Sequence, residues 1–275
     1  MSRYHDLVHL IRDRGSFLCV GLDPDRSRLP AHLGQEPQAI LDFCETIIRH
    51  TSDYAASYKI NLAFFEVLGA RSMELFASVR EMIPSECLLI ADAKRGDIGN
   101  SSRMYAETFF QTYDCDAVTV APYMGQDSVQ AFLDHTDHWT VLLALTSNSG
   151  SADFQRLALQ DGGQVYEQVL RESMTWADES QLMYVVGATH PEMFKSLREI
   201  VDNRFLLVPG VGAQGGTVAE VCAHGLTDDI GLLINSSRSI IYASSGTDFG
   251  EAAGRSARAL RDEMRSVAGS QLSRN

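Results

Sequence analysis

Short apolar runs alternate along this chain with longer stretches in which apolar residues recur every three or four positions. Runs of the first kind predict β-strands, and stretches of the second kind predict amphipathic helices. Eight strands are predicted, at residues 16–23, 56–61, 87–94, 117–122, 140–147, 182–189, 205–212 and 231–237. The helical spacing is clearest at residues 36–51, 63–82 and 103–114, between predicted strands.

Strands that are apolar on both faces predict a parallel sheet that is covered on both sides. Eight strand–helix units in 275 residues indicate a (β/α)8 TIM barrel, with residues 1–275 forming a single domain. The same alternation also permits an open, doubly wound sheet. Polar residues at the C-terminal ends of nearly all the strands favour the barrel, because barrel enzymes build their active sites there.

Composition narrows the possible partners. The formal net charge of -13 argues against nucleic acid or an anionic membrane as a partner, so an anionic ligand would require a local basic cluster. No apolar stretch approaches the ~20 residues that span a bilayer, and the N-terminus lacks a signal-peptide core, so we expect a soluble cytoplasmic protein. Five scattered cysteines without CxxC spacing predict free thiols. The histidines show no metal-ligand spacing, so we expect no metal site.

Charged residues follow the apolar part of the third predicted strand, in "ADAKRGD". Side chains in a strand alternate with a period of two, so Asp92 and Lys94 should share a side, as should Lys59 and Asn61 on the second strand. If these sides face inward, Asp23 from the first strand joins them. The sequence therefore predicts a charged cluster at the top of the barrel.

Asp97 lies beyond the third strand and could reach back to this cluster or across to another subunit. The alternative is that these charges form a solvated rim or a surface salt bridge, which contributes ~0–1 kcal/mol to stability. Several charges at fixed alternating positions, with a lysine on the adjacent strand, favour a functional site.

A glycine-rich segment, "LVPGVGAQGG", follows the seventh strand, and "INSSRSI" contains the eighth strand's end. Backbone N–H groups in such a loop, including that of Gly215, can bind phosphate at a helix N-terminus. Gln214 and Arg238 could add side-chain donors. The glycine pattern alone could be a flexible turn, but the loops after strands seven and eight are the recurrent phosphate site of this fold.

The fifth strand ends in "LTSNSG", which contains Thr146, Ser147 and Asn148. These side chains suit hydrogen bonding to the amide edge of a heterocycle, and helix capping explains them equally well. Residues 147–164 then form a long irregular segment, which we interpret as an active-site lid or an Ω-loop.

The segment "ADAKRGDIGNSS" resembles the DxKxxD signature of the orotidine 5'-phosphate decarboxylase family, in the bacterial subgroup with a DAKRGDIG motif. The resemblance extends in order through "VGLDPD", "SYKINLAFFE", "APYMG", "LTSN", "VVGAT" and "VPGVGAQGG".

The resemblance implies a cofactor-free carboxy-lyase that converts orotidine 5'-monophosphate, a nucleotide, to uridine 5'-monophosphate in de novo pyrimidine biosynthesis. It also implies a homodimer with shared active sites. Lys59, Asp92, Lys94 and Asp97 match the family's charged tetrad, with Asp97 contributed by the other subunit and Lys94 as the proton donor.

Substrate contacts follow from the same resemblance, and Asn61 is a further candidate. Asp23 matches a ribose contact, Ser147 matches the serine that reads the pyrimidine, and Gln214 and Arg238 match the phosphate grip. Ser101 stands where a threonine often contacts the ribose across the dimer. A second departure is "SNSG", where the subgroup tends to have proline after the asparagine.

Other functions stay open at this point. A Schiff-base aldolase would need a deprotonated lysine, which flanking carboxylates oppose. A metal-dependent sugar-phosphate decarboxylase of the same fold carries a related DxKxxD motif. A non-catalytic nucleotide-binding protein would not need Lys94.

Overall fold

The structure, a computed structural model, describes residues 3–188, 192–211 and 216–274. Eight parallel strands close into a barrel in chain order, with β8 pairing with β1. This confirms the predicted (β/α)8 barrel and excludes the open sheet. The strands are β1 (Leu18–Leu22), β2 (Ser57–Asn61), β3 (Leu88–Arg95), β4 (Ala117–Val120), β5 (Trp139–Leu145), β6 (Leu182–Val186), β7 (Leu206–Pro209) and β8 (Leu232–Ser236).

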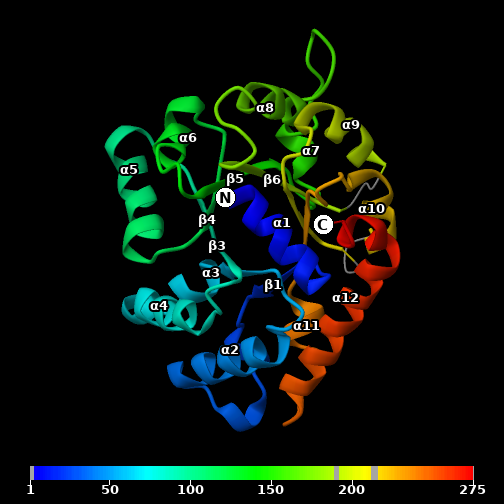
Figure 1. Ribbon diagram of the computed structural model, residues 1–275. Coiled ribbons are helices and arrows are strands. Elements are labelled where there is room, and N and C mark those ends of the chain that lie inside the picture. The colour runs from blue at the N-terminus through cyan, green and yellow to red at the C-terminus, as the bar shows by residue number, and fades with distance from the viewer. Residues whose placement is uncertain (1–2, 189–191, 212–215, 275) are drawn as a thin grey trace.

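Helices surround the barrel and cover the outer faces of the strands (Figure 1). They are α1 (Arg3–Arg14), α2 (Pro37–Thr51), α3 (Ala63–Glu66), α4 (Ser72–Met82), α5 (Gly99–Glu107), α6 (Gln126–Leu133), α7 (Ser151–Phe154), α8 (Val165–Ser173), α9 (Met193–Val201), α10 (Val218–Gly225), α11 (Arg238–Ile241) and α12 (Phe249–Leu272). Short 3-10 turns lie at Arg26–Arg28, Ala31–Leu33 and Gly69–Arg71. Every residue of β1 and of β6 is buried, as expected for strands with side chains on one face in the barrel and on the other under helices.

Two predicted helices differ from the structure. The pattern at 63–82 is interrupted between α3 and α4, where Gly69 has φ +68, a conformation that ends a right-handed helix. The pattern at 103–114 belongs to α5, which begins at Gly99 and passes into a π-helical turn at Thr108–Thr112. The apolar periodicity continues across the interruption between α3 and α4, because apolar side chains are buried on both sides of it. Phe65 before the interruption and Phe76 after it are both fully buried.

Helix α1 closes the N-terminal end of the barrel, where Figure 1 shows it crossing the opening. Its apolar face is buried. Arg3 forms an ion pair with Asp116 at 3.0 Å, and Arg12 forms one with Asp229 at 3.0 Å. Since Asp116 and Asp229 precede β4 and β8, these contacts lie at the opposite end from the C-terminal strand ends. The contacts of α1 that stabilise the barrel therefore lie at one end of it, and the candidate catalytic residues lie at the other end.

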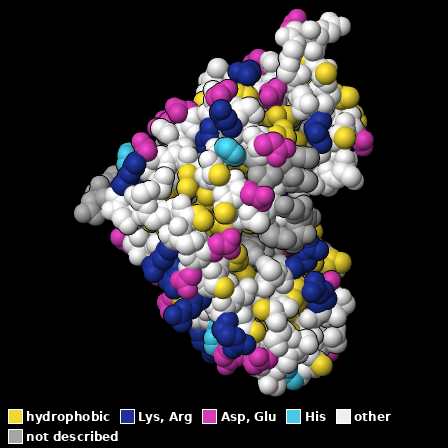
Figure 2. Space-filling view, turned by 90° about the vertical axis from the view of Figure 1, so that its right-hand side faces the viewer, with side chains coloured by type: hydrophobic (Ala, Val, Ile, Leu, Met, Phe, Trp, Pro, Cys, Tyr) yellow, Lys and Arg dark blue, Asp and Glu magenta, His cyan; other side chains and the backbone are white. Residues whose placement is uncertain are grey.

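The face formed by α9, α10 and α12 carries basic and acidic side chains intermixed, with hydrophobic ones scattered among them (Figure 2). Among the described residues, no helix combines the length and apolar character that a bilayer crossing requires.

Two glycines let α12 pack closely on α2. A Cβ at Gly254 would lie 2.8 Å from the backbone carbonyl oxygen of His50, and one at Gly250 would lie 2.7 Å from the Thr46 methyl carbon. The backbone contact is the more restrictive of the two, because a carbonyl oxygen on a helix moves only with the helix.

We therefore expect Gly254→Ala to lower the free energy of unfolding by about 1–3 kcal/mol, because the methyl group forces the two helices apart. Equilibrium urea denaturation measures this change. Gly269→Ala, in the same helix with nothing within 4 Å of the added Cβ, is the matched control and should leave stability unchanged or raise it. A Gly254→Ala protein as stable as the control would contradict the close-packing argument.

Candidate active site

A buried ion pair lies at the C-terminal ends of β2 and β3. The Lys59 ammonium donates to Asp92 Oδ2 at 2.8 Å, and both side chains are almost fully buried. The register pairs Lys59 with Ile90 and Asn61 with Asp92, so the lysine extends along the strand to reach the carboxylate. Burying two charges is tolerable because each compensates the other.

Lys94 adds a second cation to the same carboxylate. Its Nζ lies 2.6 Å from Asp92 Oδ1, while Lys59 Nζ also lies 3.7 Å from Asp23 Oδ1. The result is a series of alternating charges, Asp23, Lys59, Asp92 and Lys94, running across the mouth of the barrel. The Lys94 side chain is 51% exposed, whereas that of Lys59 is 6% exposed, so Lys94 is the cation that a ligand can reach.

The electrostatics of the series keep its buried members charged. Burial raises the pKa of Asp92, but the ammonium groups of Lys59 and Lys94 outweigh this effect and lower its pKa to about 2. Burial lowers the pKa of Lys59, but Asp92 and Asp23 outweigh it, so the pKa of Lys59 lies above its usual value. Asp92 is therefore a carboxylate and Lys59 an ammonium at neutral pH.

The backbone at Lys94 departs from a regular strand. Lys94 has φ 47, in the left-handed region that residues other than glycine rarely adopt. The pairing of β3 with β4 is irregular between Ala91 and Arg95. Strict alternation therefore does not explain why Asp92 and Lys94 meet, although their predicted proximity is observed.

Asp97 and Ser101 follow β3 in the chain and do not join this series of charges. Asp97 is in the connection between β3 and α5, where its Oδ1 accepts the Ile98 N–H at 2.8 Å. No ion pair joins Asp97 to Lys94 within the described ranges, and Ser101 is exposed in the first turns of α5. Both predicted roles depend on a second subunit and stay predictions.

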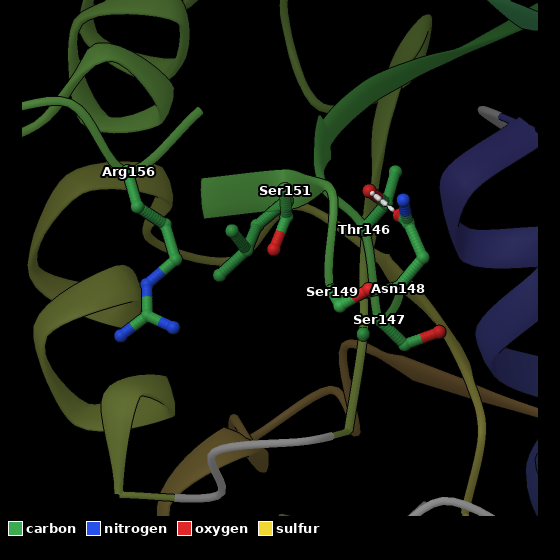
Figure 3. A pocket seen from close by; sticks show the side chains of 8 residues that line it. Thr146, Ser147, Asn148, Ser149, Ser151 and Arg156 are labelled. Atoms are coloured by element: carbon green, nitrogen blue, oxygen red, sulfur yellow. Dashed lines mark hydrogen bonds between the residues drawn. The ribbon is translucent and has the colours of Figure 1, made fainter. Parts of the chain in front are cut away.

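Ser147 lines a cavity of about 110 Å³ after β5, with Thr146, Asn148 and Gly187 (Figure 3). A Cβ at Gly187 would lie 2.8 Å from the Ser147 backbone nitrogen, so this position requires glycine. The Gln155 side chain accepts the Thr146 N–H at 2.7 Å and so ties the following segment to the strand end.

Arg156 reaches the same cavity from beyond α7, opposite Ser147 in Figure 3. The segment 147–164, predicted as a lid or Ω-loop, contains α7 and an antiparallel bridge between Ala158 and Gln164. It therefore has local structure of its own beside the cavity.

The predicted phosphate contacts are only partly described. Arg238 begins α11 directly after β8 and is exposed. Gln214 and Gly215 lie outside the described residues. Asn61 ends β2, and its Oδ1 accepts the Ala63 N–H at 3.2 Å.

Sequence reasoning missed two polar residues near β1, Asn235 and Ser237. Asn235 Oδ1 and Ser237 Oγ are buried without a hydrogen-bond partner among the described residues; Asp23 Oδ1 accepts no hydrogen bond either, but Lys59 Nζ forms an ion pair with it at 3.7 Å. A Cβ at Gly21 would lie 3.3 Å from Asn235 Oδ1, so the glycine leaves room here. Unpaired buried oxygens are costly and are characteristic of positions that a polar ligand group occupies.

Within the described part of the chain, no group of three or more His, Cys, Asp or Glu side chains could hold a metal ion. The five cysteines are free and buried. The charged groups that the strand ends bring together are the ammonium groups of Lys59 and Lys94 and the carboxylates of Asp23 and Asp92.

The family model for "Orotidine 5'-phosphate decarboxylase / HUMPS family" matches residues 16–252. The orotidine 5'-phosphate decarboxylase of Parabacteroides distasonis is 52% identical over 262 residues, which cover 94% of this chain and 93% of that protein. That of Flavobacterium johnsoniae is 51% identical over 266 residues, covering 95% and 97% respectively.

Solved structures agree. The Leishmania donovani OMP decarboxylase superimposes with a TM-score of 0.80 at 34% identity, covering 95% of this chain and 99% of that one. The family match, the identity across nearly the full length and the common barrel lead to one conclusion. The chain belongs to the orotidine 5'-phosphate decarboxylase / HUMPS family.

Proposed function

We propose that this protein is a carboxy-lyase that converts orotidine 5'-monophosphate to uridine 5'-monophosphate and CO2 in pyrimidine synthesis, with its chain acting as one catalytic domain. The relatives that are about half identical to it bear the name of this enzyme. The observation that carries the proposal is the accessible Lys94 ammonium, held 2.6 Å from the buried Asp92 carboxylate.

The reaction breaks the bond between C6 of the pyrimidine and its carboxylate. CO2 leaves, and the electron pair stays on C6 in an orbital that the ring does not delocalise. The Lys94 ammonium stabilises this developing charge and then transfers one Nζ proton to C6. The nitrogen is left neutral and regains a proton from solvent.

Asp92 has two roles in this scheme. As a carboxylate with a pKa of about 2, it places a negative charge 2.6 Å from the Lys94 ammonium and holds that ammonium in position. It also lies beside the position of the substrate carboxylate, where like charges raise the energy of the bound substrate relative to the transition state. Lys59 holds Asp92 in place from the other side at 2.8 Å.

The remaining contacts bind parts of the substrate that do not react. Binding energy from the phosphate and ribose can orient the ring over Lys94. Contacts far from the reacting carbon then contribute to catalysis. We assign the ribose, pyrimidine and phosphate contacts to Asp23, Asn61, Ser101, Ser147, Gln214, Gly215 and Arg238. This local grip explains how a chain with a net charge of -13 binds an anion.

We also propose that two copies associate so that Asp97 and Ser101 of each reach the other's site. Large apolar side chains are exposed on the segments that follow β2, β3 and β4, including α5. They are Val67, Ile98, Met104, Tyr105, Tyr123 and Met124. Exposed apolar side chains of this size favour a protein partner over solvent.

The first test is Lys94→Ala in a cofactor-free ultraviolet assay with orotidine 5'-monophosphate. We expect kcat to fall by at least about 10³-fold, because the variant loses both charge stabilisation and the proton donor. Lys195→Ala, which removes an exposed lysine of α9, is the control and should turn over like the wild type. Equal rates for Lys94→Ala and the control would refute the role of Lys94.

Mixing Asp97→Ala subunits with Lys94→Ala subunits tests the shared site. In a mixed dimer, one of the two sites receives both intact residues, so activity should rise well above that of either variant alone. A titration of one variant against the other, followed by the same assay, measures this recovery. Mixed dimers without any recovery would show that Asp97 does not act across subunits.

A further inference from the structure

We propose that Thr119, in the middle of β4, is the positioning residue that fixes Lys94 against Asp92. The inference rests on the proposed function, in which the Lys94 ammonium must be aimed at the reacting carbon. It does not follow from the charged motif itself, because Thr119 lies in an otherwise apolar strand, "AVTV".

The pairing of β3 with β4 leaves three residues opposite one. Ala91 pairs with Val118 and Arg95 pairs with Val120, so β3 advances four residues while β4 advances two. Asp92, Ala93 and Lys94 therefore face Thr119 alone. Such a bulge leaves backbone groups on the longer strand without partners in the sheet.

The Thr119 side chain supplies the missing partner. The Lys94 backbone N–H donates to Thr119 Oγ1 at 2.9 Å, across the bulge. Lys94 has φ 47, which only a compensating contact keeps populated in a residue that carries a side chain. The threonine hydroxyl thus holds the bulge in the conformation that turns Lys94 toward the site.

The same hydroxyl also orients the carboxylate. Thr119 Oγ1 donates to Asp92 Oδ1 at 3.0 Å, and this oxygen also accepts the Lys94 ammonium at 2.6 Å. The hydroxyl proton must go to Asp92, because an ionised carboxylate only accepts. A closed ring results, from the Lys94 backbone through Thr119 and Asp92 to the Lys94 ammonium.

This ring is needed because packing alone does not fix Lys94. Its side chain is 51% exposed, whereas Thr119 is fully buried. A buried β-branched side chain has restricted freedom about χ1, so its hydroxyl is a fixed reference point. Without the hydroxyl, both the backbone of Lys94 and one oxygen of Asp92 lose a hydrogen bond together.

The test compares Thr119→Val, which keeps the shape and removes the hydroxyl, with Thr119→Ser, which keeps the hydroxyl. We expect Thr119→Val to lower kcat about tenfold or more while KM changes by less than about threefold, since the phosphate and ribose contacts lie elsewhere. Thr119→Ser should retain kcat within about threefold. If Thr119→Val does not fold, Thr119→Ala provides the same comparison.

Hydrogen exchange of the Lys94 backbone amide gives a readout that does not depend on turnover. It should become at least tenfold faster in Thr119→Val and stay near the wild-type rate in Thr119→Ser. Wild-type kcat and wild-type exchange in Thr119→Val would overturn the inference, as would equal losses of kcat in both variants. A wild-type protein that does not turn over orotidine 5'-monophosphate would instead refute the proposed function, and the exchange experiment would still test Thr119.

Discussion

The site depends on one buried carboxylate, that of Asp92. It accepts from Lys59 at 2.8 Å, from Lys94 at 2.6 Å and from the Thr119 hydroxyl at 3.0 Å. A buried charge is tolerated only where partners of this kind replace the water it has lost. Each partner comes from a strand of the barrel, so the closure of the sheet is what brings them to one point.

The barrel separates this charged end from the contacts that stabilise its other end. Helix α1 covers the N-terminal opening with a buried apolar face and with ion pairs to Asp116 and Asp229. The C-terminal ends of the strands carry groups that are costly to bury, such as the oxygens of Asn235 and Ser237, which lack a hydrogen-bond partner within the described ranges. Strain at Lys94, with φ 47, is found at this end as well.

Much of this arrangement could be predicted from the sequence, because apolar and charged residues recur at regular positions along the strands. Apolar runs predicted the eight strands, and charges at the strand ends predicted that Lys59, Asp92 and Lys94 lie together. The premise of strict alternation was incomplete, since a bulge that no local pattern announces changes the register at Lys94. Thr119 was missed for a related reason, because a threonine in an apolar strand is ordinarily a packing residue.

Gly69, which interrupts the predicted helix at 63–82, shows that apolar periodicity does not reveal a break in the backbone of a helix. The role predicted for Asp97 depends on a second subunit, and the hydrophobic and charge pattern of one chain does not predict where that subunit lies.

We propose that the Lys94 nitrogen, anchored by the Asp92 carboxylate that is itself held in the barrel, faces the carbon at which negative charge develops. The most direct measurement is a crystal structure of the protein with bound uridine 5'-monophosphate. We expect the Lys94 nitrogen at about 3–3.5 Å from C6 of the base, with its contact to Asp92 intact. A nucleotide bound at the strand ends with that nitrogen directed into solvent, away from C6, would contradict it.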